Sequence, residues 1–330
     1  MPVSIKKVLR DDAIAAAALL LAAFVCYGGA GITRLGFYVD DWHLLAGMHF
    51  APPGWVSAMR GLVAQAGAIV FRPFEIPLFA GLYELNGLHP LRWQLSLMVV
   101  NLAASWNLRR VILRFGADEG AALLAALLLL AWPSKDAVMF WSCTVFLPFA
   151  LAAFLGAYRL HLEFVERGSL LALGCAGVCL LASLTSYDQC ILLFPLWMLI
   201  PTRGVAARRR AMQGTAMAAM LAGLVIFYQF KLAPIFLGQP HNKTTLFSFS
   251  HALLVYTRGF GALFGLDLAR AAWSSVRAEA AQSIFLTACA ALAAAGVFAA
   301  GAGPRPALPR RRLLGLGAGL VVLGYLPIVF

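Results

Sequence analysis

Two adjacent carboxylates stand in a short aromatic stretch after the first apolar run of the chain. The stretch reads Phe-Tyr-Val-Asp-Asp-Trp-His and contains Asp40, Asp41 and His43. Carboxylates at a membrane interface can supply a general base or hold a divalent cation. Asp is also favoured at a helix N-cap and an amphipathic stretch follows, so a structural role stays open. For His43, a metal site and an ordinary interfacial position both stay open.

Further polar residues interrupt apolar sequence at three places. Arg72 precedes Pro73, and an Arg held at an interface suits an anionic phosphate, although it can also extend to lipid headgroups. Lys135 and Asp136 follow Trp-Pro-Ser in a predicted loop, where they can pair with each other or with solvent. Asp188 lies in a polar break between two apolar runs, where it can cap a helix.

The composition sets the class of protein. Of the 330 residues, 62% are hydrophobic and 12% are charged, whereas soluble globular proteins have about 25% charged residues. These values exclude a soluble enzyme and a disordered chain, and they predict an all-α, polytopic transmembrane bundle. The net charge of +12 is explained by basic loops on the inner side of a membrane, so nucleic acid is not an expected partner.

Nine apolar runs are candidates for membrane spans of about 20 residues. They cover 13–33, 89–112, 119–134, 142–160, 169–184, 189–202, 212–232, 283–302 and 313–330. Segment 71–86 carries three charges and, at 1.5 Å per residue, reaches only about 24 Å, so an interfacial helix is expected there. Segment 246–276 holds several ionisable residues and is also expected to lie at the interface.

The basic residues support this arrangement. With the N-terminus inside, five short inner segments hold most of them: Lys6, Lys7, Arg10, Arg109, Arg110, Arg114, Arg159, Arg167, Arg203, Arg208, Arg209, Arg210, Arg305, Arg310, Arg311 and Arg312. The positive-inside rule therefore places 34–88 and 233–282 outside, as two long segments of a single transmembrane domain that covers 1–330. Any chemistry is expected on the outer face of a bacterial inner membrane, where the acids of those segments lie.

The order of these features resembles the GT-C superfamily of integral-membrane glycosyltransferases. The resemblance rests on the acidic pair after the first span, on Arg72-Pro73, on Trp-Pro-x-x-Asp-Ala-Val-x-x-Trp from Trp132, and on Ser-Leu-Thr-Ser-Tyr-Asp ending at Asp188. It covers about residues 10–200. The superfamily includes protein O-mannosyltransferases and the aminoarabinose transferases that modify lipid A.

The resemblance implies transfer of a sugar from a polyprenyl phosphate to an extracytoplasmic glycan, lipid or protein, with no cofactor required by the motifs. Attack in a single displacement would invert the anomeric centre, which is a prediction from the mechanism. Asp40, or Asp41, would deprotonate the acceptor hydroxyl, and Arg72 would contact the lipid phosphate. Asp136 would help hold the acceptor, although Glu is common in the family at that place. Four residues are further expected to contact substrate: His43, Lys135, Asp188 and Arg258. A divalent cation at the acidic pair stays an alternative.

The chain departs from the family at two other places. Ser-Cys-Thr at 142–144 stands where an Arg is common. The resemblance also implies further spans after the Leu-Pro at 326–327, so the C-terminal part of a longer protein is expected to be missing. A lipid-linked sugar transporter or flippase, and a non-catalytic assembly protein, are the competing interpretations. Transporters often show repeated halves, and this sequence has no internal repeat.

Overall fold

The computed structural model describes residues 5–27, 29–131, 141–200, 202 and 204–237. Over these residues the secondary structure is helical and contains no strand, which confirms the all-α prediction. The helices are α1 (Ile5–Cys26), α2 (Val39–His49), α3 (Trp55–Gln65), α4 (Glu75–Asn86), α5 (Pro90–Arg114), α6 (Glu119–Ala131), α8 (Phe146–Arg167), α9 (Leu170–Ser186), α10 (Val205–Phe227) and α11 (Ala233–Leu237). The 3₁₀-helices are η1 (Gly29–Arg34), η2 (Gly67–Phe71), η3 (Ser142–Thr144) and η4 (Asp188–Leu199), and η5 (Tyr228–Leu232) is a π-helical turn.

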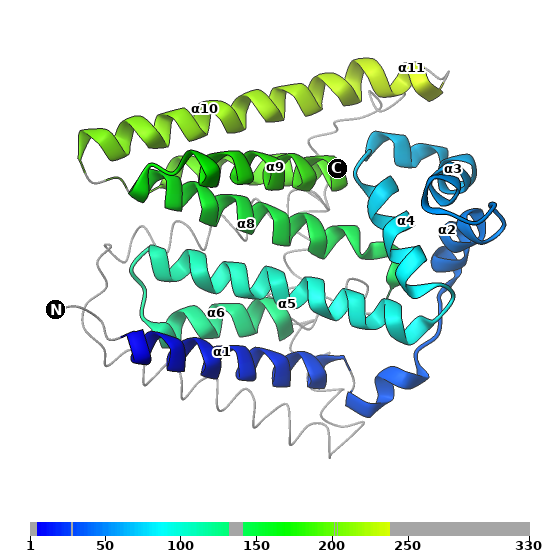
Figure 1. The fold of residues 1–330 in the computed structure, drawn as a ribbon, viewed down its shortest axis with the longest axis horizontal. Helices are drawn as coiled ribbons and strands as arrows, with labels where there is room; N and C mark the ends of the chain where they lie inside the picture. The colour runs from blue at the N-terminus through cyan, green and yellow to red at the C-terminus, as the bar shows by residue number, and fades with distance from the viewer. Residues whose placement is uncertain (1–4, 28, 132–140, 201, 203, 238–330) are drawn as a thin grey trace, which may run out of the picture.

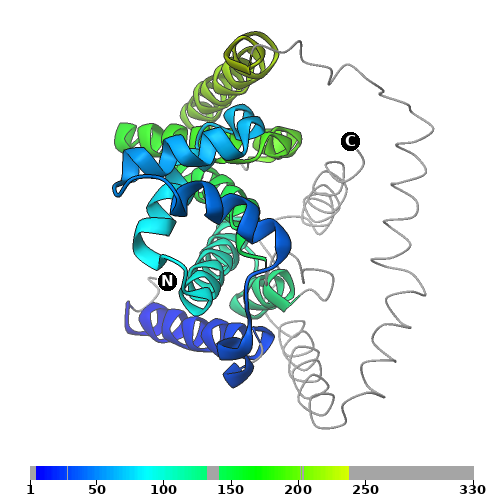
Figure 2. The ribbon, with the colours of Figure 1, turned by 90° about the vertical axis from the view of Figure 1, so that its right-hand side faces the viewer.

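The six longer helices lie side by side in a stack that runs from α1, past α6, α5, α8 and α9, to α10 (Figure 1). Helices α2, α3 and α4 pack across one end of this stack, and the end-on view shows them lying over the ends of the long helices (Figure 2). From α1 through α5, α6 and α8 to α9 the direction alternates, and α10 runs the same way as α9 because η4 lies between them in the chain. The start of α1, the α5–α6 and α8–α9 turns and the start of α10 therefore meet at the opposite end.

Glycines bring α2 and α3 into close contact within the end layer. A Cβ atom on Gly61 would collide with the carbonyl oxygen of Gly47, so the two helix backbones touch at this point. Leu45, Met48, Leu62 and other apolar side chains fill the space between α2, α3, α4 and α5. The end layer is therefore packed against the bundle as a platform, and the first turn of α2 is held in place by it.

Helices lie in all seven of the predicted spans that the structure describes, but two of those predictions were wrong in detail. Helix α1 begins at Ile5 and not at 13, because the charged residues before the apolar run continue the same helix. The run 189–202 is a 3₁₀-helix from Asp188 to Leu199, where an α-helix was expected. Predicted segments 246–276, 283–302 and 313–330 lie outside the described residues.

Two helical stretches are long and apolar enough to cross a bilayer. They are Ser142–Arg167, which joins η3 to α8, and Val205–Phe236, which runs through α10 and η5. Helices α6 and α9 are apolar but shorter. This composition is weakly compatible with a membrane protein.

Arginines and carboxylates form ion pairs at the end of the bundle opposite α2–α4. The fully buried Arg109 donates from Nη1 to Asp12 at 2.7 Å and from Nη2 to Glu119 at 2.6 Å, which ties α5 to α1 and α6. Arg114 bridges in the same way to Glu163 and Glu166 on α8. The predicted inner basic clusters at 109–114, 159–167 and 208–210 thus lie at one end of the fold.

Candidate functional site

Asp41 joins the first turn of α2 to the segment that leads into α8. Its Oδ1 accepts the backbone N–H of Cys143 at 2.6 Å, and its Oδ2 accepts the backbone N–H of Tyr38 at 2.9 Å. The side chain is buried, with 1% of its surface exposed. A carboxylate that accepts two backbone N–H groups is held by strong, charge-assisted hydrogen bonds. Asp41 is therefore a fixed anchor between two parts of the chain that lie 102 residues apart.

Asp40 has a different environment from its neighbour. Its side chain is exposed, and it makes no hydrogen bond or ion pair to the described part of the chain. Tyr38 is the N-cap residue of α2, and Asp41 at the third helical position accepts its backbone N–H, so Asp41 fills the structural capping role from inside the helix and Asp40 does not. With Asp41 fixed by backbone hydrogen bonds, Asp40 is the carboxylate of the pair that an external hydroxyl group can reach.

Arg72 lies in the corner between η2 and α4. Its Nη1 is 3.4 Å from Oε1 of the buried Glu75, and its guanidinium lies 5.0 Å from the ring centre of Phe146 and 5.1 Å from that of Tyr187. Such cation–π contacts orient a guanidinium without consuming its N–H donors. About a third of the side chain, 31%, remains exposed. Arg72 can therefore present donors to an anion from a fixed position.

The segment 142–146 links the two groups. Asp41 binds the backbone of Cys143, and Arg72 lies on the ring of Phe146, three residues further along. The end of α9 joins the same corner, because the N–H of Phe74 donates to the carbonyl of Thr185 at 3.3 Å. The structure thus gathers the acidic pair, the arginine and the start of α8 at the α2–α4 end of the bundle.

Aromatic side chains cluster at the first turn of α2. The ring of Tyr38 lies 5.7 Å from that of Trp141, the last residue of the Trp-Pro motif. Trp42, next to the acidic pair, is half exposed and packs edge-on against Phe37 at 5.2 Å. Exposed aromatic faces beside a carboxylate give flat, amphipathic surfaces on which an apolar or sugar-like ligand can lie.

The remaining predicted residues fall into two groups. Asp188 begins η4 directly after Tyr187, so its backbone is adjacent to the Arg72 corner. His43 lies on the outside of α2, where its Nδ1 is 3.3 Å from Nε2 of Gln65 on α3, so it does not join the acidic pair. Lys135, Asp136 and Arg258 lie outside the described residues.

The acidic pair does not fit a divalent cation in this arrangement. Both oxygens of Asp41 face backbone N–H donors, so only Asp40 could offer its carboxylate to a cation. Within the described residues, no group of three or more His, Cys, Asp or Glu side chains is placed to hold a metal ion.

No family model matches the chain, and no curated protein and no solved structure shows significant similarity to it.

Sequence reasoning did not find several residues that shape the corner. In the sequence Glu75 is one charge of segment 71–86, and Phe146 and Tyr187 belong to an apolar run and a polar break, yet all three contact Arg72. Tyr228 and Gln229 also reach this corner, donating to the carbonyls of Val70 and Phe71. The aromatic residues at the ends of predicted spans were the one available indication, since rings often gather at membrane interfaces.

Proposed function

We propose that the chain is a membrane glycosyltransferase of the GT-C type that uses a polyprenyl-phosphate-linked sugar. The acceptor is a glycan, lipid or protein on the outer face of a bacterial inner membrane. The nine-span topology with a cytoplasmic N-terminus is part of this proposal. It is supported by the position of the basic clusters at the end of the bundle opposite Asp40.

One observation carries the proposal: Asp41 and Arg72 pack against the same segment at 142–146. A transferase of this kind needs a base near the acceptor hydroxyl and a cation near the departing phosphate. The exposed Asp40 and the partly exposed side chain of Arg72 supply groups of these two types at one end of the fold.

The reaction follows from these roles. The acceptor oxygen attacks the anomeric carbon while Asp40 takes its proton, and the bond from that carbon to the phosphate oxygen breaks. The polyprenyl phosphate leaves as an anion, whose growing charge is stabilised by the N–H donors of Arg72. Because a single displacement occurs, the configuration at the anomeric carbon inverts.

Replacement of Arg72 tests the phosphate contact. We expect Arg72→Gln to lower the transfer rate from a polyprenyl-phosphate sugar by about 10²–10³-fold, the usual cost of one donor to a developing oxyanion. The Lys variant should keep part of the activity, because it retains the charge but not the planar set of donors. The measurement is the initial rate of label transfer by purified protein, with each variant's unfolding in detergent recorded alongside.

Arg92→Gln is the matched control, since Arg92 is exposed at the start of α5, at the same end of the bundle. Its rate should remain within about twofold of the wild type, as is usual for exposed positions away from a site. Equal rates for the Arg72 and Arg92 variants would remove Arg72 from the reaction.

A further inference from the structure

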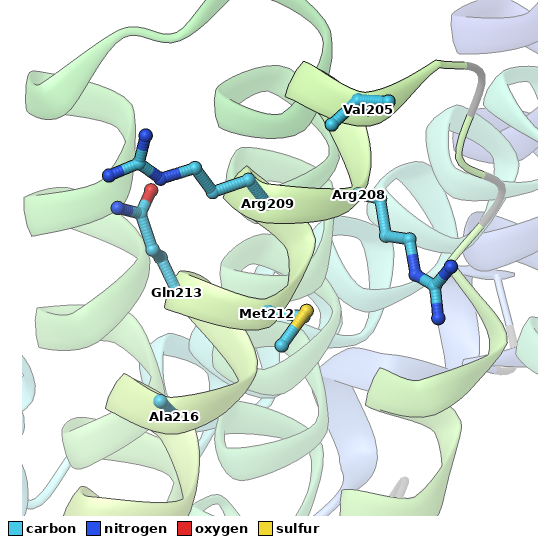
Figure 3. A pocket seen from close by; sticks show the side chains of 6 residues that line it. All are labelled: Val205, Arg208, Arg209, Met212, Gln213 and Ala216. Atoms are coloured by element: carbon cyan, nitrogen blue, oxygen red, sulfur yellow. The ribbon is translucent and has the colours of Figure 1, made fainter.

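A shallow groove lies on α10 at the end of the bundle opposite Asp40. Its volume is about 430 Å³, and it is lined by Val205, Arg208, Arg209, Met212, Gln213 and Ala216 (Figure 3). Arg209 and Gln213 extend to one side of the helix, and Arg208 extends to the other. All six residues come from the first three turns of one helix. The groove therefore combines two cations with an apolar floor.

The charges of Arg208 and Arg209 are uncompensated in the described part of the chain. Neither has an ion pair there, although both lie at the end where Arg109, Arg110 and Arg114 each contact a carboxylate. Helix α10 also has no acidic residue in its first turn, so the positive end of its dipole adds to the two guanidinium charges. The local potential favours an anion.

An apolar stripe continues from the arginines along α10. Met212, Ala216, Met220 and Leu224 follow one another at four-residue intervals, and the three large side chains are 65%, 68% and 56% exposed. From Met212 to Leu224 the stripe rises about 18 Å at 1.5 Å per residue. That length is close to one leaflet of a hydrocarbon core about 30 Å thick.

We propose that this surface binds an anionic phospholipid of the cytoplasmic leaflet. The headgroup phosphate is held by the guanidinium of Arg209 together with the amide of Gln213, and Arg208 adds positive charge from the other flank. One acyl chain lies along Met212, Ala216 and Met220. The inference depends on α10 crossing the membrane with its start on the inner side, and it does not depend on sugar transfer.

The apolar stripe distinguishes a lipid from a free anion. A soluble phosphate would gain from the two arginines but would leave Met212 and Met220 exposed, whereas a phospholipid covers both parts of the surface. Burial of exposed methionine side chains is favourable by the hydrophobic effect. The headgroup and the chain thus match the two halves of one surface.

The test measures lipid binding to the purified full-length chain in detergent by native mass spectrometry. The probes are phosphatidylglycerol and phosphatidylcholine with identical acyl chains, and inorganic phosphate as a competitor. Phosphatidylglycerol should bind at least about tenfold more tightly than phosphatidylcholine. The double variant Arg208→Gln/Arg209→Gln should lose about 30-fold in affinity, as expected for two surface cations at an anionic membrane. A Met212→Gln/Met220→Gln variant should bind about tenfold more weakly with both arginines intact.

The control variant is Arg60→Gln/Arg92→Gln, which removes the same charge from two exposed arginines at the other end of the bundle and should bind normally. Three results would overturn the proposal. They are unchanged affinity in the Arg208/Arg209 variant, equal binding of the two lipids, and displacement of phosphatidylglycerol by inorganic phosphate at similar concentrations. Because no sugar transfer is measured, failure here would leave the transferase proposal untouched.

Discussion

Replacement of Asp40 by Asn is expected to lower sugar transfer by about 10²–10⁴-fold, the range for loss of a general base. The fold should remain intact, because the Asp40 side chain is exposed and makes no hydrogen bond to the described residues. Asn has almost the same shape as Asp but cannot take a proton from the acceptor hydroxyl. The measurement is the initial rate of label transfer from a polyprenyl-phosphate sugar by the purified variant.

The neighbouring Asp41 provides the comparison. Asp41→Asn places an NH₂ group against one of two backbone N–H donors, Tyr38 or Cys143, so a charge-assisted hydrogen bond is lost. The expected cost is about 1.5–3 kcal/mol in the free energy of unfolding, because the group is buried. Wild-type activity in Asp40→Asn, with only Asp41→Asn impaired, would show that the pair is structural and not catalytic.

The second large effect is expected at Arg109. This side chain is fully buried, it pairs with Asp12 and Glu119, and its guanidinium lies 5.0 Å from the ring centre of Trp106. Loss of one partner of a buried ion pair costs about 3–5 kcal/mol. We expect Arg109→Gln to lower the free energy of unfolding by about 3 kcal/mol, the low end of this range, because both carboxylates keep some contact with water. The measurement is unfolding by a denaturing detergent, followed by circular dichroism.

Arg110 is the matched control for this prediction. It shares Asp12 with Arg109 at 3.0 Å, but 36% of its side chain is exposed. Exposed ion pairs contribute about 0–1 kcal/mol, so Arg110→Gln should unfold almost like the wild type. Equal destabilisation by the two variants would mean that Arg109 does not tie α1, α5 and α6 together.

The apolar pattern of the sequence predicts the long helices well and their polar ends poorly. Helix α5 begins within a residue of the predicted boundary, whereas α1 extends eight residues further toward the N-terminus through Lys6, Lys7 and Arg10. A hydropathy pattern does not show that a helix continues into a stretch of charged residues. It also does not distinguish an α-helix from the 3₁₀-helix of 188–199, since both bury the same apolar side chains.

The candidate site was predictable in its residue types but not in its contacts. The carboxyl pair and Arg72 stand out because charges are rare in this chain. The different environments of Asp40 and Asp41 could not be foreseen, because they depend on a backbone N–H that lies 102 residues away. The role of Arg109 was missed for the same reason. The sequence pattern indicates its cluster only as an orientation signal, because its partners come from two other helices.

The most direct test of the account follows the fate of a labelled sugar. Purified wild-type chain is reconstituted in vesicles that carry a polyprenyl-phosphate-linked, labelled sugar and an envelope fraction as acceptor. The account predicts that label appears on the acceptor with inverted configuration, that one polyprenyl phosphate is released per sugar transferred, and that Asp40→Asn stops both. Movement of the intact donor across the bilayer without cleavage of its sugar–phosphate bond would contradict the account and identify a transporter.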